Sequence, residues 1–81
     1  MTLEILTPDK KVFEGEVIGA KFPGTKGSFE VLNNHAPLIS TLANGELRIA
    51  TASGYQFFNV EGGVVEVLNN KIVVLAEAVL S

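Results

Sequence analysis

The sequence contains no cysteine, no tryptophan and only one histidine among its 81 residues. Without cysteine there can be no disulfide framework and no thiolate metal site, so any core must be held together by packing alone. No apolar run approaches the roughly 20 residues that a membrane-spanning helix needs. The chain does not open with a basic segment followed by an apolar stretch, so no signal peptide is predicted. These absences predict a soluble protein.

Clustered basic residues are also lacking. Six Lys and Arg stand against nine Asp and Glu, which gives a net charge of −3 with both signs scattered along the chain. Nucleic-acid binding depends on a basic patch or stripe, so no nucleic-acid partner is expected. The length fits one small domain, and we expect a single β-sandwich domain over residues 1–81.

The chain does contain many short alternating segments separated by turn residues. In the first of these, Leu3 and Ile5 alternate with Glu4 and Leu6, which is the period of a strand. Turn signals such as Ser53-Gly54 recur about every 8 to 12 residues, as in all-β sandwiches and barrels. The pattern predicts strands over residues 2–7, 11–14, 16–22, 46–52, 55–61, 64–68 and 72–77, and therefore an all-β fold.

Three local features carry more specific expectations. Gly15 is expected to mark a bend or bulge between two short strands. Alternation over residues 16–22 is expected to place Ile18 on the same face as Ala20 and Phe22. Asn44-Gly45 is expected to form a tight turn, because both residue types tolerate positive φ.

The segment from Phe22 to Leu42 does not alternate as its flanks do. It holds two of the three prolines, the only histidine, and the glycines Gly24 and Gly27. Such dense punctuation is typical of a functional loop or of a corner where the chain changes sheets. The pentapeptide Glu30–Asn34 also recurs as Glu66–Asn70, which we interpret as two strands that each end in an Asn-Asn turn.

Catalytic chemistry has little support in the sequence. His35 is the only imidazole, and it lacks the glycine-flanked nucleophile turn of hydrolases, so a local hydrogen bond is the simpler interpretation. Glu14 and Glu16 share one strand face, where exposed glutamates are commoner than a catalytic dyad. The spacing of Gly24 and Gly27 does not match a phosphate-binding loop. We expect no catalytic residue, no metal site and no cofactor.

Several blocks in order along the whole chain resemble one family. They are Thr7-Pro8, Val12-Phe13-Glu14-Gly15-Glu16-Val17, Pro23-Gly24-x-x-Gly27-x-Phe29, Asn34-His35-Ala36-Pro37-Leu38, Gly45-Glu46-Leu47-Arg48-Ile49, Gly62-Gly63-Val64-Val65-Glu66-Val67 and Val73-Val74-Leu75-Ala76-Glu77-Ala78. With these blocks, the chain resembles the epsilon subunit of the F-type ATP synthase. The His-Ala-Pro-Leu block after a Pro-Gly-x-x-Gly loop is the most specific of them.

The resemblance implies a small flattened β-sandwich of about ten short strands and a non-catalytic role. Epsilon subunits of this type belong to the rotor, or central stalk, of the F1Fo ATP synthase, where they join the gamma subunit to the c ring and couple proton-driven rotation to ATP synthesis. The resemblance implies a c-ring interface formed by Thr25, Lys26, Gly27, Ser28 and Glu30, and a gamma-subunit interface formed by Thr7, His35 and Ser40.

Further expectations follow from the same resemblance. The protein should lie peripherally at the cytoplasmic face of a bacterial inner membrane, with the thylakoid stromal face as the alternative, and should touch the membrane only through the c ring. Longer family members add two carboxyl-terminal helices that inhibit ATP hydrolysis and in some cases bind ATP. If Ser81 is the natural terminus, this chain should lack that arm and should bind no nucleotide itself.

Two departures and two rival functions accompany the resemblance. Glu30 stands where family members often carry Gly, and Asn33-Asn34 where they carry Pro and a small residue. Asn can adopt the same turns, so we expect the corner to survive. The rivals are a lipoyl- or biotinyl-type carrier domain and an unrelated β-sandwich adaptor. A carrier needs a lysine at a mid-chain hairpin tip within a motif such as Asp-Lys-Ala, and Lys26 lacks those neighbours.

Overall fold

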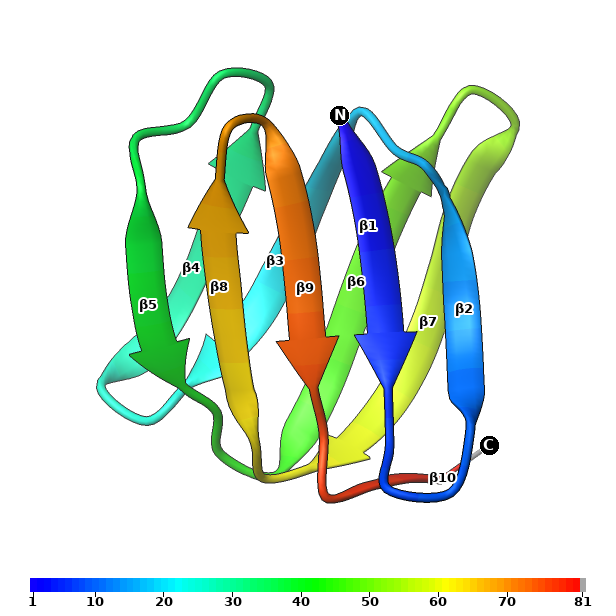
Figure 1. Cartoon of the computed structure of the whole chain (residues 1–81), viewed down its shortest axis with the longest axis vertical. Coiled ribbons are helices and arrows are strands. Elements are labelled where there is room, and N and C mark those ends of the chain that lie inside the picture. Colours follow the sequence, from blue (N-terminus) through cyan, green and yellow to red (C-terminus); the bar gives the residue numbers. More distant parts are fainter. Residues whose placement is uncertain (81) are drawn as a thin grey trace.

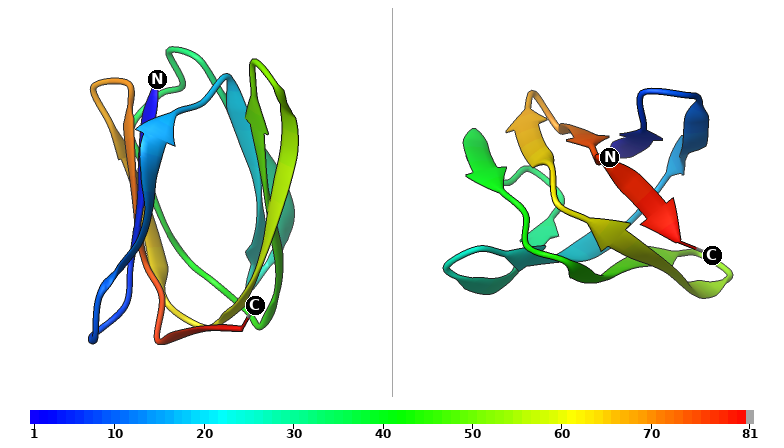
Figure 2. Two further views of the ribbon diagram at one scale, coloured as in Figure 1. Left: turned by 90° about the vertical axis from the view of Figure 1, so that its right-hand side faces the viewer. Right: turned by 90° about the horizontal axis from the view of Figure 1, so that it is seen from below.

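The computed structural model describes residues 1–80, which form ten strands in two sheets packed face to face (Figure 1). Figure 2 shows the two layers from the side and from below. Sheet A has the strand order β2-β1-β9-β8-β5, and sheet B has the order β10-β7-β6-β3-β4. The prediction of an all-β sandwich is confirmed. The strands are β1 (Thr2–Leu6), β2 (Lys11–Glu16), β3 (Gly19–Gly24), β4 (Gly27–Leu32), β5 (Leu38–Thr41), β6 (Gly45–Thr51), β7 (Gly54–Glu61), β8 (Val64–Leu68), β9 (Lys71–Leu75) and β10 (Ala78–Leu80).

Both ends of the chain contribute to the sheets. Strands β1 and β9 pair in parallel in the middle of sheet A, while the other paired strands run antiparallel. Strand β10 then crosses to the other layer and pairs with β7 at the edge of sheet B. The fold is therefore closed by contacts between segments that are distant in the sequence. No helix in the described part of the chain is long and apolar enough to cross a membrane.

The core lies between the two sheets. Phe22 is its largest fully buried side chain, and its ring centroid lies 5.5 Å from that of Phe29. Each fully buried side chain of this size contributes about 1.5 to 3 kcal/mol relative to exposure. No polar or charged side chain among residues 1–80 is buried. The buried core consists of Leu3, Ile5, Val17, Ala20, Phe22, Val31, Leu42, Leu47, Ile49, Val60, Val65, Val67, Ile72, Val74 and Ala76.

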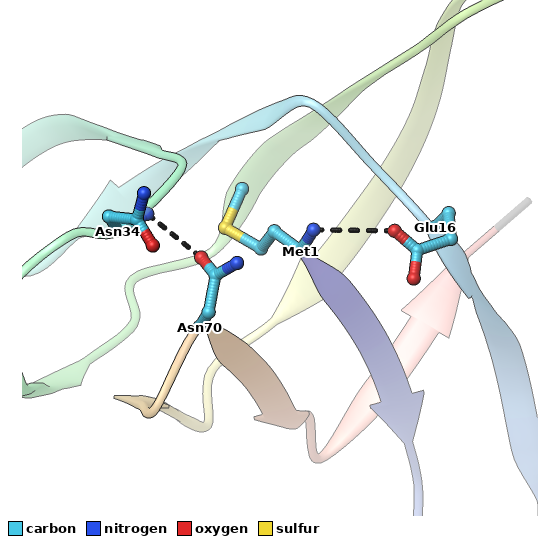
Figure 3. Close-up of polar contacts among 4 residues, drawn as sticks. All are labelled: Met1, Glu16, Asn34 and Asn70. Carbon is cyan, nitrogen blue, oxygen red and sulfur yellow. Dashed lines mark hydrogen bonds and ion pairs between the residues drawn. The ribbon is translucent and has the colours of Figure 1, made fainter.

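The chain crosses from sheet A to sheet B at Val17 and Ile18. The Val17 N–H donates to the Met1 carbonyl at 2.8 Å, whereas the Ile18 N–H donates to the Ala50 carbonyl of sheet B, also at 2.8 Å. Beside this crossing the Met1 amino group lies 3.3 Å from the Glu16 carboxylate (Figure 3). Val17 is buried and Ile18 is 56% exposed. The predicted alternation, which placed Ile18 on the same face as Ala20 and Phe22, was wrong, because the strand alternation does not continue through the crossing between the sheets.

The predicted break at Gly15 was also wrong. Strand β2 runs without interruption through Gly15, which lies opposite Leu3. A Cβ atom at this glycine would lie 3.3 Å from the ring of Phe13, so the residue makes room for that ring. The irregularity lies earlier, where Ile5 pairs with Phe13 but Leu6 pairs with Lys11. One extra residue on β2 is typical of a β-bulge.

The predicted tight turn at Asn44-Gly45 does not form. Neither residue has a positive φ; among residues 1–80 the non-glycine residues with positive φ are Asn34, Asn69 and Asn70. The segment instead carries the chain from β5 of sheet A to β6 of sheet B. A Cβ atom on Gly45 would lie 3.0 Å from the Pro23 Cβ atom. The glycine therefore permits close packing between strands.

Candidate interaction surfaces

The only imidazole of the chain forms a local contact. His35 is exposed in the loop between β4 and β5, and its Nδ1 atom lies 2.7 Å from the Ala36 carbonyl oxygen. A carbonyl can only accept, so Nδ1 carries the proton in this arrangement. No three metal-ligating side chains gather within residues 1–80.

The hairpin between β3 and β4 has an exposed polar tip formed by Thr25, Lys26, Gly27 and Ser28. Gly27 has a φ of 123°, which favours glycine at the end of this turn. Two hydrogen bonds fasten the tip to the edge of sheet A. The Oγ1 atoms of Thr25 and Thr41 lie 2.7 Å apart, and the Thr25 N–H donates to the Thr41 carbonyl at 3.2 Å. The tip thus has a fixed position relative to both sheets.

Of the residues expected at the c-ring interface, Glu30 lies away from the tip. It faces the outer side of sheet B, opposite Lys21 in the strand pairing. Its carboxylate lies 3.5 Å from the Arg48 guanidinium, which also sits 4.7 Å from the centre of the Tyr55 ring. The charge of Glu30 is therefore partly balanced within the sheet.

The residues expected at the gamma interface are not brought together. Thr7 closes the turn between β1 and β2, where its N–H donates to the Lys10 carbonyl at 2.9 Å. His35 lies in the β4–β5 loop at the opposite end of sheet A (Figure 1). Ser40 lies on β5 and lines a depression of about 380 Å³ beside the Thr25–Gly27 tip. All three belong to segments that border sheet A.

Sequence reasoning missed the apolar outer face of sheet A. Because directly paired residues point to the same side of a sheet, the pairing places Leu6 beside Leu75, Leu75 beside Val64, and Glu66 between Val73 and Ile39. Ile39 is 70% exposed and Leu75 is 54% exposed. We call this surface, formed by Leu6, Ile39, Val64, Leu68, Val73 and Leu75, the sheet A outer face.

A signal for this face was present in the sequence. Strands β8 and β9 carry apolar residues at consecutive positions, as in Val64-Val65 and Val73-Val74, so that both faces of each strand are partly apolar. Only one parity can point into the core of a two-layer sandwich, so the other must be apolar on the outside. Contiguous exposed apolar surface of this kind is typical of a protein-protein contact.

The outer side of sheet B carries a second, smaller apolar group around Leu32, Tyr55 and Phe57. Here Arg48 sits between the aromatic and acidic side chains, close to both Tyr55 and Glu30. Within this group, Arg48 and Glu30 already pair with each other.

Known proteins match this chain over its whole length. The family model for the ATP synthase delta/epsilon chain β-sandwich domain matches residues 1–81. The ATP synthase epsilon chain of Chlorobaculum tepidum is 40% identical over 79 residues, covering 96% of this chain and 90% of that relative. The epsilon chain of Salinibacter ruber is 39% identical over 88 residues, covering 98% of this chain but only 59% of that relative. This chain thus spans little more than half of some relatives and most of others.

Solved structures share the fold. A chain in the mitochondrial ATP synthase of Euglena gracilis, solved with OSCP, F1 and c-ring, superimposes with a TM-score of 0.90 at 20% identity, covering 96% of this chain and 51% of that chain. A chain in the central stalk and c-ring assembly of the Tetrahymena thermophila mitochondrial enzyme gives a TM-score of 0.86 at 18% identity, covering 99% and 65%. At such identities the likeness establishes the fold alone.

Proposed function

Because this chain belongs to the ATP synthase delta/epsilon family, as a β-sandwich domain of the epsilon type, we propose that it acts as a non-catalytic subunit of the central stalk. In that role it connects the gamma subunit to the c ring and helps to couple proton-driven rotation to ATP synthesis. It lies peripherally, at the cytoplasmic face of a bacterial inner membrane, and reaches the membrane through the c ring. Its named relatives include bacterial epsilon chains.

One observation carries this proposal. The molecule presents a large apolar face and a separate polar tip, and these suit two different partners. The sheet A outer face is apolar, as expected of a stable protein-protein contact. Thr25–Ser28 form an exposed tip at one corner of the sandwich (Figure 1).

We assign the gamma subunit to the sheet A outer face. Thr7 lines a depression of about 280 Å³ together with Leu6 and Leu75. Ser40 supports this assignment less directly, because it pairs with the buried Val65 and so points toward the inner side of the sheet, beside the Thr25–Gly27 tip. His35 marks the far end of the same edge. Thr7 and His35 lie at opposite ends of the face, so a partner large enough to contact both would cover the apolar residues between them.

We assign the c ring to the Thr25–Ser28 tip. A small polar tip is suited to contact with polar loops. Its two hydrogen bonds to Thr41 hold the tip in place against sheet A. Glu30 contributes less directly, since it lies on the outer side of sheet B beside Arg48. The rival carrier function lacks support, because Lys26 occupies a hairpin tip without the flanking residues of a carrier motif.

Two measurements test the proposal. The purified chain should form a complex with the gamma subunit of the same organism at micromolar concentration, and failure to do so would favour an unrelated adaptor. In assembled enzyme, a Ser28→Cys variant should cross-link to a cysteine in the polar loop of a c subunit. The matched control is Ser53→Cys, which lies in the β6–β7 turn at the other end of the sandwich (Figure 1). Equal cross-linking of both variants would remove the c-ring assignment.

A further inference from the structure

Glu66 is a charged residue among the apolar side chains of the sheet A outer face. Glu66 lies in the middle of β8, opposite Val73 of β9 and Ile39 of β5. Along its own strand the same face continues with Val64 and Leu68, because alternate residues share a side. Glu66 therefore occupies the centre of the surface that we assign to the gamma subunit.

The neighbouring acids differ from Glu66 because they already have partners. Glu4 and Glu14 lie 3.2 Å and 2.8 Å from the Lys11 Nζ atom, and Glu16 lies 3.3 Å from the terminal amino group. Within the described residues 1–80, no cation lies within 4.0 Å of the Glu66 carboxylate. The carboxylate of Glu66 thus remains available to a partner.

Lys71 is the base nearest in register to Glu66 on this face. It lies two residues along β9 from Val73, which is the residue directly opposite Glu66. Lys71 lines one depression together with Glu66, but the two side chains form no ion pair within 4.0 Å. No direct ion pair within residues 1–80 therefore holds the Glu66 carboxylate.

The surface on either side of Glu66 is hollowed. A depression of about 370 Å³ lies toward β5 and is lined by Pro37, Ile39 and Leu68 as well as Glu66. Another of about 330 Å³ lies toward β9 and is lined by Val73 and Lys71. Both are large enough to receive side chains of a partner, and both lie within reach of the carboxylate.

Covering Glu66 with purely apolar surface would remove an ionised carboxylate from water without compensation, which is strongly unfavourable. We propose that the gamma-subunit surface seated on the sheet A outer face carries a lysine or arginine that pairs with Glu66, surrounded by apolar side chains. This inference rests on the proposed function and adds the chemistry of the contact. The pair sets the register of docking, because any displaced arrangement leaves two charges buried and unpaired.

Binding of the purified gamma subunit to three variants tests the inference. Glu66→Gln removes the charge and keeps the shape, and we expect the dissociation constant to rise about 10- to 30-fold. Glu66→Lys places two like charges together and should raise it more than about 100-fold. Glu46→Lys makes the same charge change at an exposed residue of β6 in sheet B, and the dissociation constant of this variant should stay within about threefold of the original. Unfolding temperatures verify that each variant is folded. If Glu66→Lys does not fold, the dissociation constant of Glu66→Gln tests the pairing by itself.

Charge reversal on the partner completes the test. The lysines and arginines of the gamma subunit are changed to glutamate one at a time, and each gamma variant is tested for binding to Glu66→Lys. One of these gamma variants should restore binding. Equal binding by Glu66→Lys and Glu46→Lys, or a loss that no reversal restores, overturns the pairing while leaving the proposed function intact. Failure of the unaltered chain to bind the gamma subunit overturns the proposed function, and the inference with it.

Discussion

The main-chain N–H of Asn34 donates a hydrogen bond of 2.8 Å to the side-chain Oδ1 of Asn70 (Figure 3). The bond joins the β4–β5 loop to the β8–β9 turn, although the two residues lie 36 positions apart. These are the corresponding last residues of the pentapeptide that occurs twice in the sequence. Each adopts a positive φ, of 62° at Asn34 and 61° at Asn70. The repeated Asn thus serves two turns that meet in space.

Two substitutions of Asn70 separate the contribution of this hydrogen bond to the free energy of unfolding from the contribution of the backbone conformation. Asn70→Gly keeps easy access to positive φ and loses the bond, so we expect a loss of about 1 kcal/mol in the free energy of unfolding. Asn70→Ala loses the bond and also strains the backbone, so we expect a loss of about 2 kcal/mol. Urea unfolding measures both. The control is Asn33→Ala at an exposed position without positive φ, and similar losses in all three variants would contradict the role of the bond.

A pair of glycines allows steric crowding to be measured apart from backbone strain. Gly63 and Gly27 have nearly the same φ, 119° and 123°. A Cβ atom on Gly63 would lie 2.2 Å from the Leu75 carbonyl oxygen, whereas nothing lies within 4 Å of one on Gly27. Both alanine variants carry the cost of the backbone conformation, about 1 to 3 kcal/mol. We expect Gly63→Ala to be less stable than Gly27→Ala by a further 1 to 3 kcal/mol or so.

Thermal unfolding of the two glycine variants checks this expectation. In a domain of this length, about 1 kcal/mol lowers the unfolding temperature by roughly 4 to 8 °C. Equal unfolding temperatures for Gly63→Ala and Gly27→Ala would mean that the β7–β8 connection relaxes freely and that its close approach to β9 is not required.

The sequence predicted those strands whose pattern was undisturbed. Leu3 and Ile5 share one face of β1 as expected, and that face is buried in the core. Strands β4 and β5 were not predicted from periodicity, because they lie in the Phe22–Leu42 segment with its prolines and glycines. Of the two interpretations of that segment, a functional loop or a corner where the chain changes sheets, the structure confirms the corner, since β4 belongs to sheet B and β5 to sheet A.

The surfaces were harder to predict than the strands. Alternation was expected to place Ile18 on the same face as Ala20 and Phe22, but Ile18 is exposed whereas those two residues are buried. The centre of the sheet A outer face brings together Ile39, Glu66 and Val73 from three strands. Their proximity depends on strand order and register, which no local pattern specifies. Sequence motifs identified the family, whereas the charge in the middle of that face required the structure.

The ion pairs of Lys11 predict how stability changes with pH. A hydrogen bond from Lys11 and the positive charge of Lys11 lower the pKa of Glu14. In turn, the hydrogen bond to Glu14, followed by the one to Glu4, raises the pKa of Lys11. A carboxylate with a lowered folded-state pKa stabilises the fold above its unfolded pKa of about 4.3 and loses that contribution as pH falls through the folded value. Conversely, Lys11 contributes below its unfolded pKa of about 10.4 and loses its contribution as pH rises through the raised value.

A double-mutant cycle with Glu14→Gln and Lys11→Gln measures this coupling. We expect a small stabilising coupling at pH 7, since both side chains are largely exposed. It should fall toward zero in acid as Glu14 takes up a proton, and 1 M salt should weaken it at neutral pH. Unfolding temperatures at several pH values provide the measurement. A coupling that is unchanged well below pH 4 would show that the Lys11–Glu14 contact is not ionic.

A matched pair of isoleucines tests which face of the sandwich docks. Ile39 is 70% exposed on the sheet A outer face, and Ile18 is 56% exposed where the chain enters sheet B. Neither side chain is buried in the core, so Ile39→Ser and Ile18→Ser should both change the unfolding temperature little. Complete burial of an isoleucine at an interface contributes about 1.5 to 3 kcal/mol, so Ile39→Ser should raise the dissociation constant for the gamma subunit about 10- to 100-fold. Ile18→Ser should leave it within about threefold, and the reverse order of effects would move the gamma contact from sheet A to sheet B.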